Sequence, residues 1–404
     1  MGASVRSAVV VDAVRSATGK GKPGGALSGI HSVELLGQVL AGLMARNDID
    51  PGEVEDVLVG CVSQAADQAG TPGRWAWLAA GLPEHVPSVT IDRRCGSSQQ
   101  ALHFAAQGII AGTYDVAVAG GVESMSRVPM GTARMGADPF GPSAQARYGG
   151  LVSQGISAEL VAARWKLDRD AQDEYAARSQ RLAAEASSSG AFDGEIVPVL
   201  APVDQDDPGA GTVEVTVDET IRAGTTVEGL AKLRPAFADE AMAERFPQID
   251  WSVTAGNSSQ LADGASALLV MEEERAAALG LEPIARIVAM SVVSDDPIMM
   301  LSGPIPATRR VLERTGMSID QFDHFEVNEA FAPVPLAWQV ELGADPERLN
   351  PRGGAIALGH PLGASGTRLM TTMLHALRDG GGRYGLQTMC EAGGMANATI
   401  VERL

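Results

Sequence analysis

The stretch 115-DVAVAGGVESM-125 decides the fold of this chain, because it combines a strand-like apolar run with a double glycine. The same combination returns in 384-YGLQTMCEAGGM-395, roughly 270 residues later, which is the spacing of repeated domains and not of a solenoid. We therefore predict two similar halves. Shorter echoes occur at the same offset: residues 49–50 lead into 57–59, and residues 319–320 lead into 325–327.

Strand-like runs alternate with helical patterns over much of the remaining chain. This alternation is typical of an α/β protein, in which helices cover a largely parallel sheet. The fold class predicted from the sequence is therefore α/β. The predicted strands are 5–11, 56–59, 88–91 and 115–119, and the predicted helices include 33–46, 98–111 and 307–314.

The chain has 404 residues, which exceeds the usual size of a domain with one core. The segment 123–251 interrupts the alternation with loop-forming stretches (GADPFGPS, VDQDDPGAG) and a helical region with polar faces at 157–187. Connections of this length are usually lids or binding elements, although a solvated excursion would have the same composition. We predict an N-terminal half (1–122 and 252–275), an inserted segment (123–251) and a C-terminal half (276–404).

Composition excludes several classes of protein. The formal charge of −19 argues against a general binder of nucleic acid or of acidic membranes. No apolar run approaches the length of a membrane span, and the N-terminus lacks the plan of a signal peptide. The three cysteines form neither a disulfide framework nor a metal motif, which favours a reducing compartment. We expect a cytoplasmic protein without a metal site.

Two thiols and one imidazole lie in turns of small residues. Cys95 opens CGSSQQA between a strand-like and a helical segment, and a helix N-terminus stabilises a thiolate. Cys390 opens CEAGGMANA, and His360 lies in GHPLGASG, where glycines let the backbone approach a ligand. An imidazole there could deprotonate a thiol or donate to an oxyanion. A single cysteine is more often an inert buried side chain, but the three groups together suggest covalent acyl chemistry.

Asn328 follows the strand-like HFEV and begins NEAFA. Asparagine is a favoured helix N-cap, so capping alone would explain it. The alternative is that its side chain orients a water molecule or donates to a carbonyl oxygen. The sequence leaves both interpretations open.

From DAVRSATGK at Asp12 to the C-terminus, the chain resembles the thiolases, which are acetyl-CoA C-acyltransferases. Several separated motifs in the same order carry this resemblance: CGSSQQA, GGVESMS, TAGNSSQLADGA, NEAFA, GHPLGASG and the Cys390 turn. The resemblance implies a five-layered αβαβα core of two halves, with an inserted loop domain over the coenzyme A site. It also implies a homodimer or a dimer of dimers, with coenzyme A as a substrate and no permanently bound cofactor.

The resemblance also implies roles for the site residues. Cys95 becomes acylated, His360 activates it, and Cys390 makes the second proton transfer. A water held by Asn328 serves the enolate oxygen, and the backbone N–H groups of Cys95 and Ala392 serve the tetrahedral intermediate. Many thiolases have glycine at the last of these positions, so alanine would restrict the backbone if its φ were positive.

The substrate-binding residues are carried over in the same way. Ser259 matches a serine that contacts the pantetheine arm, and Arg222 matches a residue near the nucleotide. Met300 and Phe331 match positions that line the acyl end of the pocket. Without the resemblance, each has an ordinary explanation: a serine closing a turn, a solvated arginine and two core side chains.

Features of the inserted segment and the C-terminus bear on substrate choice. Ser153, Gln154 and Gly155 stand where acetoacetyl-CoA thiolases have His-Met-Gly, and the closing GLQTMCEAGGMANATIVERL resembles degradative thiolases for longer or steroid 3-ketoacyl-CoA. We expect thiolytic cleavage in β-oxidation, with acetoacetyl-CoA synthesis as the alternative. A non-catalytic acyl-CoA or lipid binder would tolerate loss of Cys390. A cysteine hydrolase would not use Cys390, and condensing ketosynthases typically replace that cysteine with His or Asn.

Overall fold

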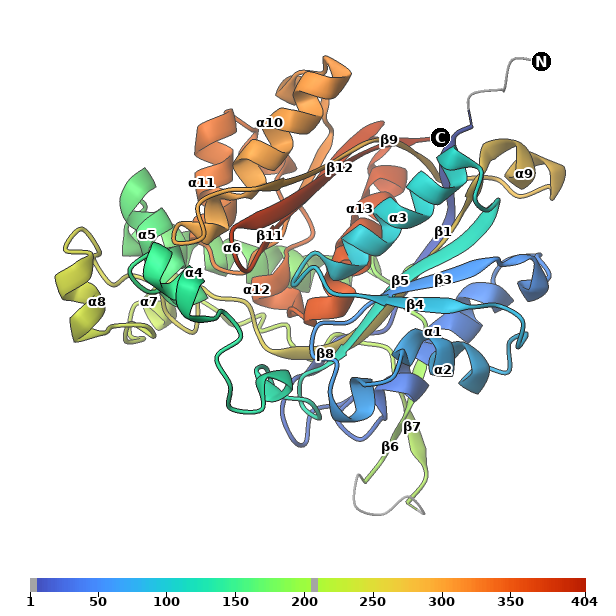
Figure 1. Ribbon diagram of the computed structural model, residues 1–404, viewed down its shortest axis with the longest axis horizontal. Helices are drawn as coiled ribbons and strands as arrows, with labels where there is room; N and C mark the ends of the chain where they lie inside the picture. Colours follow the sequence, from blue (N-terminus) through green and yellow to red (C-terminus); the bar gives the residue numbers. More distant parts are fainter. Residues whose placement is uncertain (1–5, 205–209) are drawn as a thin grey trace.

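One sheet of ten strands runs through the whole molecule (Figure 1). The computed structural model describes residues 6–204 and 210–404. Nine of the strands follow the order β10-β11-β12-β9-β1-β8-β5-β3-β4, and β2 pairs with β8 beside this path. Their bounds are β1 Ala8–Arg15, β2 Gly19–Lys20, β3 Asp56–Gly60, β4 Ser88–Ile91, β5 Val116–Ser124, β8 Ala262–Glu272, β9 Ala285–Ser294, β10 His324–Val327, β11 Tyr384–Glu391 and β12 Met395–Arg403.

The two ends of this sheet have the same pairing pattern. In the first half β3 is parallel to β5, β5 is antiparallel to β8, and β8 is antiparallel to β1. In the second half β10 is parallel to β11, β11 is antiparallel to β12, and β12 is antiparallel to β9. Within the sheet, Val9 and Val10 of β1 pair with Arg286 and Ala285 of β9 and link the two halves. The prediction of two similar halves is confirmed.

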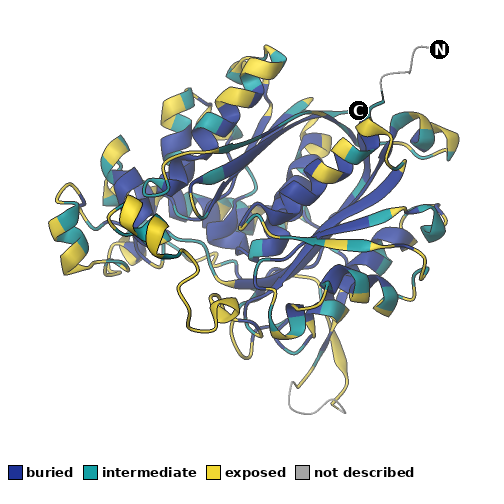
Figure 2. Ribbon diagram, viewed as in Figure 1, coloured by how far each residue is buried: buried dark blue, intermediate teal, exposed yellow. Residues whose placement is uncertain are grey.

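Helices form three layers around the two halves of the sheet. Helices α1 (Ser32–Ala45) and α2 (Pro72–Ala79) pack on the first half, and α10 (Pro304–Thr315) packs on the second, beside α11 (Pro333–Leu342). Helices α3 (Ser97–Ala111) and α13 (Ser365–Gly380) lie between the halves, where they are largely buried (Figure 2). The result is the expected αβαβα order, with a separate apolar cluster at each helical layer.

The strand predicted at 115–119 continues through its double glycine to Ser124. A Cβ atom at Gly121 would lie 2.2 Å from the carbonyl oxygen of Gly363, so only glycine allows this close approach. The glycines therefore keep the strand flat against the turn that follows His360, and they do not end it. The first predicted strand, 5–11, lies further along the chain, at Ala8–Arg15.

The inserted segment lies between β5 and β8. The helical region predicted at 157–187 consists of two helices, because Asp168 caps the second by accepting from the N–H of Ala171 at 2.9 Å. Of the stretch 203–211, residues 205–209 lie outside the described residues. The elements are α4 Pro142–Arg147, α5 Gln154–Trp165, α6 Arg169–Ser188, β6 Val199–Pro202, β7 Thr212–Val215, α7 Val227–Leu230 and α8 Glu240–Arg245; α9 Glu273–Ala278 and α12 Ala355–Leu358 follow later in the chain.

Within residues 6–204 and 210–404, no helix is both long enough and apolar enough to cross a bilayer.

Candidate active site

The N-terminal ends of α3 and α13 meet at the centre of the molecule. The N–H of Thr367 donates to Ser98 Oγ at 3.0 Å, and a Cβ at Gly366 would lie 2.1 Å from the backbone nitrogen of Gln99. Cys95 precedes α3, and Leu362, from the turn before α13, packs against it. The two glycine-rich motifs, far apart in sequence, therefore form one site.

A buried carboxylate holds the turn that carries His360. The side chain of Glu123, at the end of β5, accepts from the N–H groups of Val62, Ser63 and Gly363 at 3.0, 3.0 and 2.8 Å. Hydrogen bonds from several backbone N–H groups stabilise an ionised carboxylate. The GGVESMS motif thereby fixes the turn between His360 and α13.

His360 is buried and contacts two polar side chains. Its Nδ1 lies 2.6 Å from Ser365 Oγ, and its Nε2 lies 3.4 Å from the Nδ2 of Asn328. Burial, with the nearby Arg368 adding to it, lowers the pKa of His360 to about 3. The imidazole is therefore neutral at neutral pH and able to accept a proton.

Asn328 does not cap a helix. It lies directly after β10, whereas α11 begins only at Pro333, so the interpretation as an N-cap is wrong. Its backbone N–H donates to Thr388 of β11 at 3.1 Å, which holds it beside the strand that carries Cys390. Its Oδ1 is buried and has no hydrogen-bond partner within the described part of the chain. That acceptor is available to a water molecule or a substrate.

Cys95 and Cys390 come from different halves, and both are buried. Burial, with the charge of Glu391 adding to it, raises the pKa of Cys95 to about 12, while its own backbone N–H and the side chain of Gln154 act in the opposite direction. Burial and the neighbouring Cys95 raise the pKa of Cys390 well above its ordinary value. Both thiols are therefore protonated at neutral pH, and ionisation of Cys95 would need a base.

The turn after Cys390 does not force Ala392 into a left-handed conformation. The positive φ angles fall on Gly393 (92°) and Gly394 (84°), and φ of Ala392 is not positive. The restriction considered from the sequence is therefore absent. Ala392 packs partly buried against the apolar cluster that contains Cys390.

The predicted acyl-pocket residues lie together. Met300 and Phe331 belong to the same apolar cluster as Cys390, and the Phe331 ring meets Phe237 of the inserted segment edge to face at 5.8 Å. The inserted segment therefore contributes one wall of this apolar region.

Ser259 lies between the Asn328 loop and His360. Its N–H donates to the carbonyl oxygen of Ala330 at 3.0 Å, and the next carbonyl, of Gln260, accepts from the N–H of His360 at 2.9 Å. Arg222 is exposed, and its backbone N–H donates to Gln180 Oε1 at 2.7 Å. The structure thus places Ser259 beside the catalytic candidates and Arg222 at the surface.

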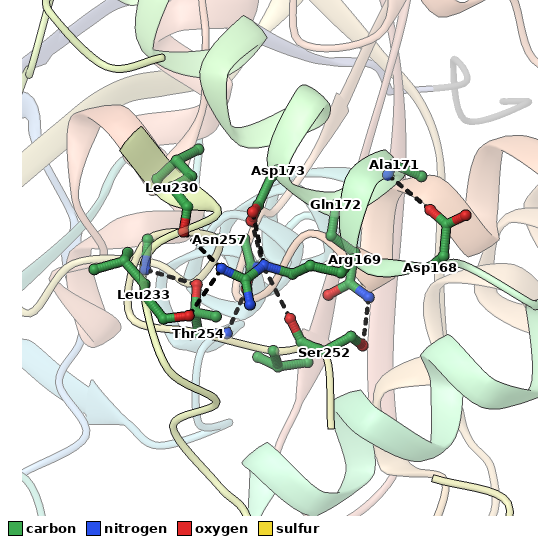
Figure 3. A network of polar contacts seen from close by, with 12 residues as sticks. Asp168, Arg169, Ala171, Gln172, Asp173, Leu230, Leu233, Ser252, Thr254 and Asn257 are labelled. Carbon is green, nitrogen blue, oxygen red and sulfur yellow. Dashed lines mark hydrogen bonds and ion pairs between the residues drawn. The ribbon is translucent and has the colours of Figure 1, made fainter. Parts of the chain in front are cut away.

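A buried polar network anchors the segment before Ser259 to α6 (Figure 3). Asn257 Nδ2 donates to Asp173 Oδ1 at 2.9 Å, and Gln172 Nε2 donates to Ser252 Oγ at 2.7 Å. Arg169 pairs with Asp173 at 2.6 Å. Side-chain hydrogen bonds therefore hold the beginning of the TAGNSSQLADGA motif against α6 of the inserted segment. The sequence alone did not predict these contacts.

Two residues near the nucleophile were not predicted to be functional. The side chain of Gln154 lies close enough to the Cys95 thiol to act against the rise in its pKa, and the carboxyl of Glu391 lies close enough to raise the pKa of both Cys95 and Cys390. Gln154 stands where this sequence departs from the His-Met-Gly of acetoacetyl-CoA thiolases, which was the signal available for it. Glu391 lies between Cys390 and Ala392, at a position for which the motif specifies no residue, so no sequence signal pointed to it. Within the described residues, no group of three or more His, Cys, Asp and Glu side chains is arranged to hold a metal ion.

Comparison with known proteins matches two family models, "Thiolase, N-terminal domain" over residues 8–274 and "Thiolase, C-terminal domain" over residues 281–403. A steroid 3-ketoacyl-CoA thiolase of Mycobacterium tuberculosis, FadA6, is 48% identical over 100% of this chain and 96% of its own. A 3-ketoacyl-CoA thiolase of Marinobacter nauticus is 42% identical over the whole of both chains. The crystal structure of an acetyl-CoA acetyltransferase of Bacillus anthracis superposes with a TM-score of 0.87 at 38% identity, covering 99% of each chain.

Proposed function

Because this chain belongs to the thiolase family and is therefore an acyltransferase, we propose that it cleaves 3-ketoacyl-CoA with coenzyme A in degradation. The products are acetyl-CoA and an acyl-CoA shortened by two carbons. Two relatives named as 3-ketoacyl-CoA thiolases, one of them a steroid thiolase, support this direction and a place in fatty-acid or steroid side-chain β-oxidation. Coenzyme A is a substrate, and no permanently bound cofactor takes part.

The first half of the reaction makes an acyl-enzyme. His360 takes the proton of Cys95, and the thiolate attacks the 3-keto carbon. The bond between C2 and C3 then breaks, which leaves the acyl group on Cys95 and an acetyl-CoA enolate. Cys390 protonates the enolate carbon and becomes a thiolate.

The second half returns the enzyme to its resting state. The Cys390 thiolate takes the proton of the incoming coenzyme A, whose sulfur attacks the acyl carbon on Cys95. Cys95 leaves as a thiolate and recovers its proton from His360. A thiolate is suited to both halves because it is a good nucleophile and a good leaving group.

Fixed donors stabilise the charge that develops on oxygen. His360 and a water molecule held by the Asn328 side chain donate hydrogen bonds to the enolate oxygen. One such donor stabilises the transition state by about 3 kcal/mol. The buried Oδ1 of Asn328, which accepts no hydrogen bond from any described residue, supports this role. The N–H groups of Cys95 and Ala392 serve the tetrahedral intermediate, which the ordinary φ at Ala392 permits.

The observation that carries the proposal is that two buried thiols from opposite halves lie close enough for Cys95 to raise the pKa of Cys390, in a molecule whose buried His360 is neutral and hydrogen-bonded to Ser365. We assign Ser259 to the pantetheine arm and Arg222 to the nucleotide, and we assign Met300 and Phe331 to the acyl end.

The wider organisation remains part of the proposal. The halves are 1–122 with 252–275, and 276–404, and residues 123–251 cover the coenzyme A site. The protein works in the cytoplasm as a homodimer or a dimer of dimers, binding neither nucleic acid nor membrane.

The test is thiolysis of acetoacetyl-CoA, a long-chain 3-ketoacyl-CoA and a steroid-side-chain 3-ketoacyl-CoA, each with coenzyme A. Preference for the bulky substrates, lost in Cys95→Ser and Cys390→Ser, supports the degradative assignment. Preference for acetoacetyl-CoA would move it to the short-chain enzyme. Binding of acyl-CoA without turnover of any substrate would identify a non-catalytic binder.

A further inference from the structure

The carboxyl group of Glu391 packs against the turn that follows Cys95. Glu391 follows Cys390 at the end of β11 and is fully buried. A Cβ atom added to Gly96 would lie 2.0 Å from Glu391 Oε1 and 2.9 Å from Asn397 Nδ2. Since Gly96 follows Cys95, the carboxyl of one half rests against the catalytic turn of the other.

Neither oxygen of this carboxyl has a hydrogen-bond partner within residues 6–204 and 210–404. Glu123, the buried carboxylate nearby, is the opposite case, because backbone N–H groups satisfy both of its oxygens. A buried carboxyl without donors is costly to ionise. Burial accordingly raises the pKa of Glu391 to about 8, and Arg93 acts in the opposite direction.

The charge of Glu391 acts on both active-site thiols, since it raises the pKa of Cys95 and of Cys390. The interaction is reciprocal, because two neighbouring negative charges oppose each other. The thiols ionise more readily when Glu391 is protonated, whereas an ionised Glu391 adds to the effect of burial and keeps them protonated. This buried group has no part in the proposed proton transfers.

We propose that Glu391 is a positioning residue that controls, through its charge, how readily Cys95 and Cys390 ionise. The inference rests on the proposed function, in which Cys95 is the nucleophile. The titratable and charged groups that face Glu391 are Cys390 on its own strand, and Cys95 and Arg93 from the segment before α3. Strand β12 contributes the neutral Asn397.

The test compares the alkylation of Cys95 by iodoacetamide in the full-length protein and in Glu391→Gln, from about pH 6 to about pH 9.5. Mass spectrometry of the peptide that begins at Cys95 gives the rate for this thiol alone. At the low end Glu391 is neutral, so the two proteins react equally. Above about pH 8 the variant reacts about tenfold faster, which corresponds to one pKa unit. Glu391→Asp keeps the charge and should retain the suppression seen in the unchanged protein.

A constant ratio between Glu391→Gln and the unchanged protein at every pH would overturn the inference, because general disturbance of the turn has no reason to follow the charge. Equal rates throughout would overturn it as well. The readout needs no turnover, so it separates this inference from the proposed function: retained thiolysis in Cys95→Ser would refute the latter, whatever the alkylation rates show. Thermal unfolding of each variant verifies that it is folded.

Discussion

Ser365 determines which nitrogen of His360 carries the proton. The two side chains meet at 2.6 Å, between Nδ1 and Oγ, and the Ser365 hydroxyl donates its single proton to the carbonyl oxygen of Pro361 at 2.9 Å. Nδ1 must therefore be the donor to Ser365. This leaves a lone pair on Nε2, which faces the amide of Asn328. Nε2 is therefore the atom that would take the proton of Cys95 in the proposed mechanism.

Replacing Ser365 with alanine should lower kcat for thiolysis about fivefold, because one orienting hydrogen bond is worth about 1 kcal/mol. KM should change little, since Ser365 is buried behind the imidazole. Steady-state kinetics with a fixed 3-ketoacyl-CoA measure both constants.

Thr371→Val is the matched control for Ser365→Ala. Thr371 is also buried on α13, and its hydroxyl donates to a backbone carbonyl one turn away, that of Thr367 at 2.8 Å. Among the hydrogen bonds of the described residues, none joins Thr371 to His360. Equal losses of kcat in both variants would show that Ser365 acts through helix packing and not through the tautomer.

Replacing Cys95 and replacing Cys390 should block different steps of the proposed reaction. Cys95→Ser should lower thiolysis by at least about a thousandfold, because serine is a poor leaving group and forms no thioester. Cys390→Ser should still become acylated at Cys95 by a simple acyl-CoA while losing carbon–carbon cleavage. Mass spectrometry of the intact protein after incubation with acyl-CoA detects the acyl-enzyme.

The third cysteine provides the control for these variants. Cys61 is buried after β3 and plays no part in the proposed mechanism. Cys61→Ala should keep the thiolysis rate and still form the acyl-enzyme. If it lost both, the effects of the other two replacements would reflect general sensitivity of the core to loss of a thiol.

The sequence was sufficient for much of the fold, because the recurring strand and double glycine revealed two halves and the alternation of strands and helices revealed the class. It misplaced details that depend on tertiary contacts. The glycines of β5 looked like the end of a strand, yet they keep it extended against the carbonyl of Gly363. Asn328 looked like a cap because asparagine is a favoured N-cap and follows a strand. The helix begins instead at Pro333, whose fixed φ suits the first turn of a helix.

From the sequence, only those site residues could be predicted that lie in motifs shared with the thiolases. The resemblance pointed to Cys95, His360 and Cys390 by their positions in the motifs. No local sequence pattern reveals that the Glu391 side chain, from the other half, packs against Gly96. A side chain's partners across a domain interface depend on the packed structure and not on sequence spacing. Neither oxygen of this carboxyl has a hydrogen-bond partner among the residues that the structure describes, which no sequence pattern can show.

Gly96→Ala tests that contact through stability. The new methyl group would overlap the Glu391 carboxyl, so unfolding free energy should fall by about 1–3 kcal/mol. The loss should shrink by more than half when Glu391→Ala is the starting protein, since the obstructing side chain is gone. Denaturant unfolding of the four proteins in this cycle measures the coupling.

Gly380→Ala is the control for the glycine replacement. Its added Cβ meets no atom within 4 Å, and its φ is not positive, so stability should be unchanged or slightly raised. Additive costs for Gly96→Ala and Glu391→Ala would contradict the contact between Glu391 and the Cys95 turn.

Glu391 should also make stability depend on pH. Folding raises its pKa from an ordinary 4.5 to about 8, so between these values the folded protein keeps a proton that the unfolded chain has lost. The unfolding free energy therefore falls as pH rises through this window and levels off above it. Relative to Glu391→Gln, the unchanged protein should lose on the order of 2–4 kcal/mol between about pH 5 and about pH 8. Urea unfolding at both pH values measures this difference, and a difference that is independent of pH would contradict it.

Arg222 should contribute to the binding of coenzyme A and not to the chemical steps. Its side chain is exposed, so Arg222→Ala should leave folding intact and raise the KM for coenzyme A about threefold to tenfold, the effect of one screened contact to a phosphate. The kcat should hold, because the nucleotide lies far from the reacting carbon. Arg310→Ala, on the outer helix α10, is the matched loss of an exposed arginine. If both variants raise the KM equally, the effect reflects the overall charge of the protein, and the assignment of Arg222 to the nucleotide is wrong.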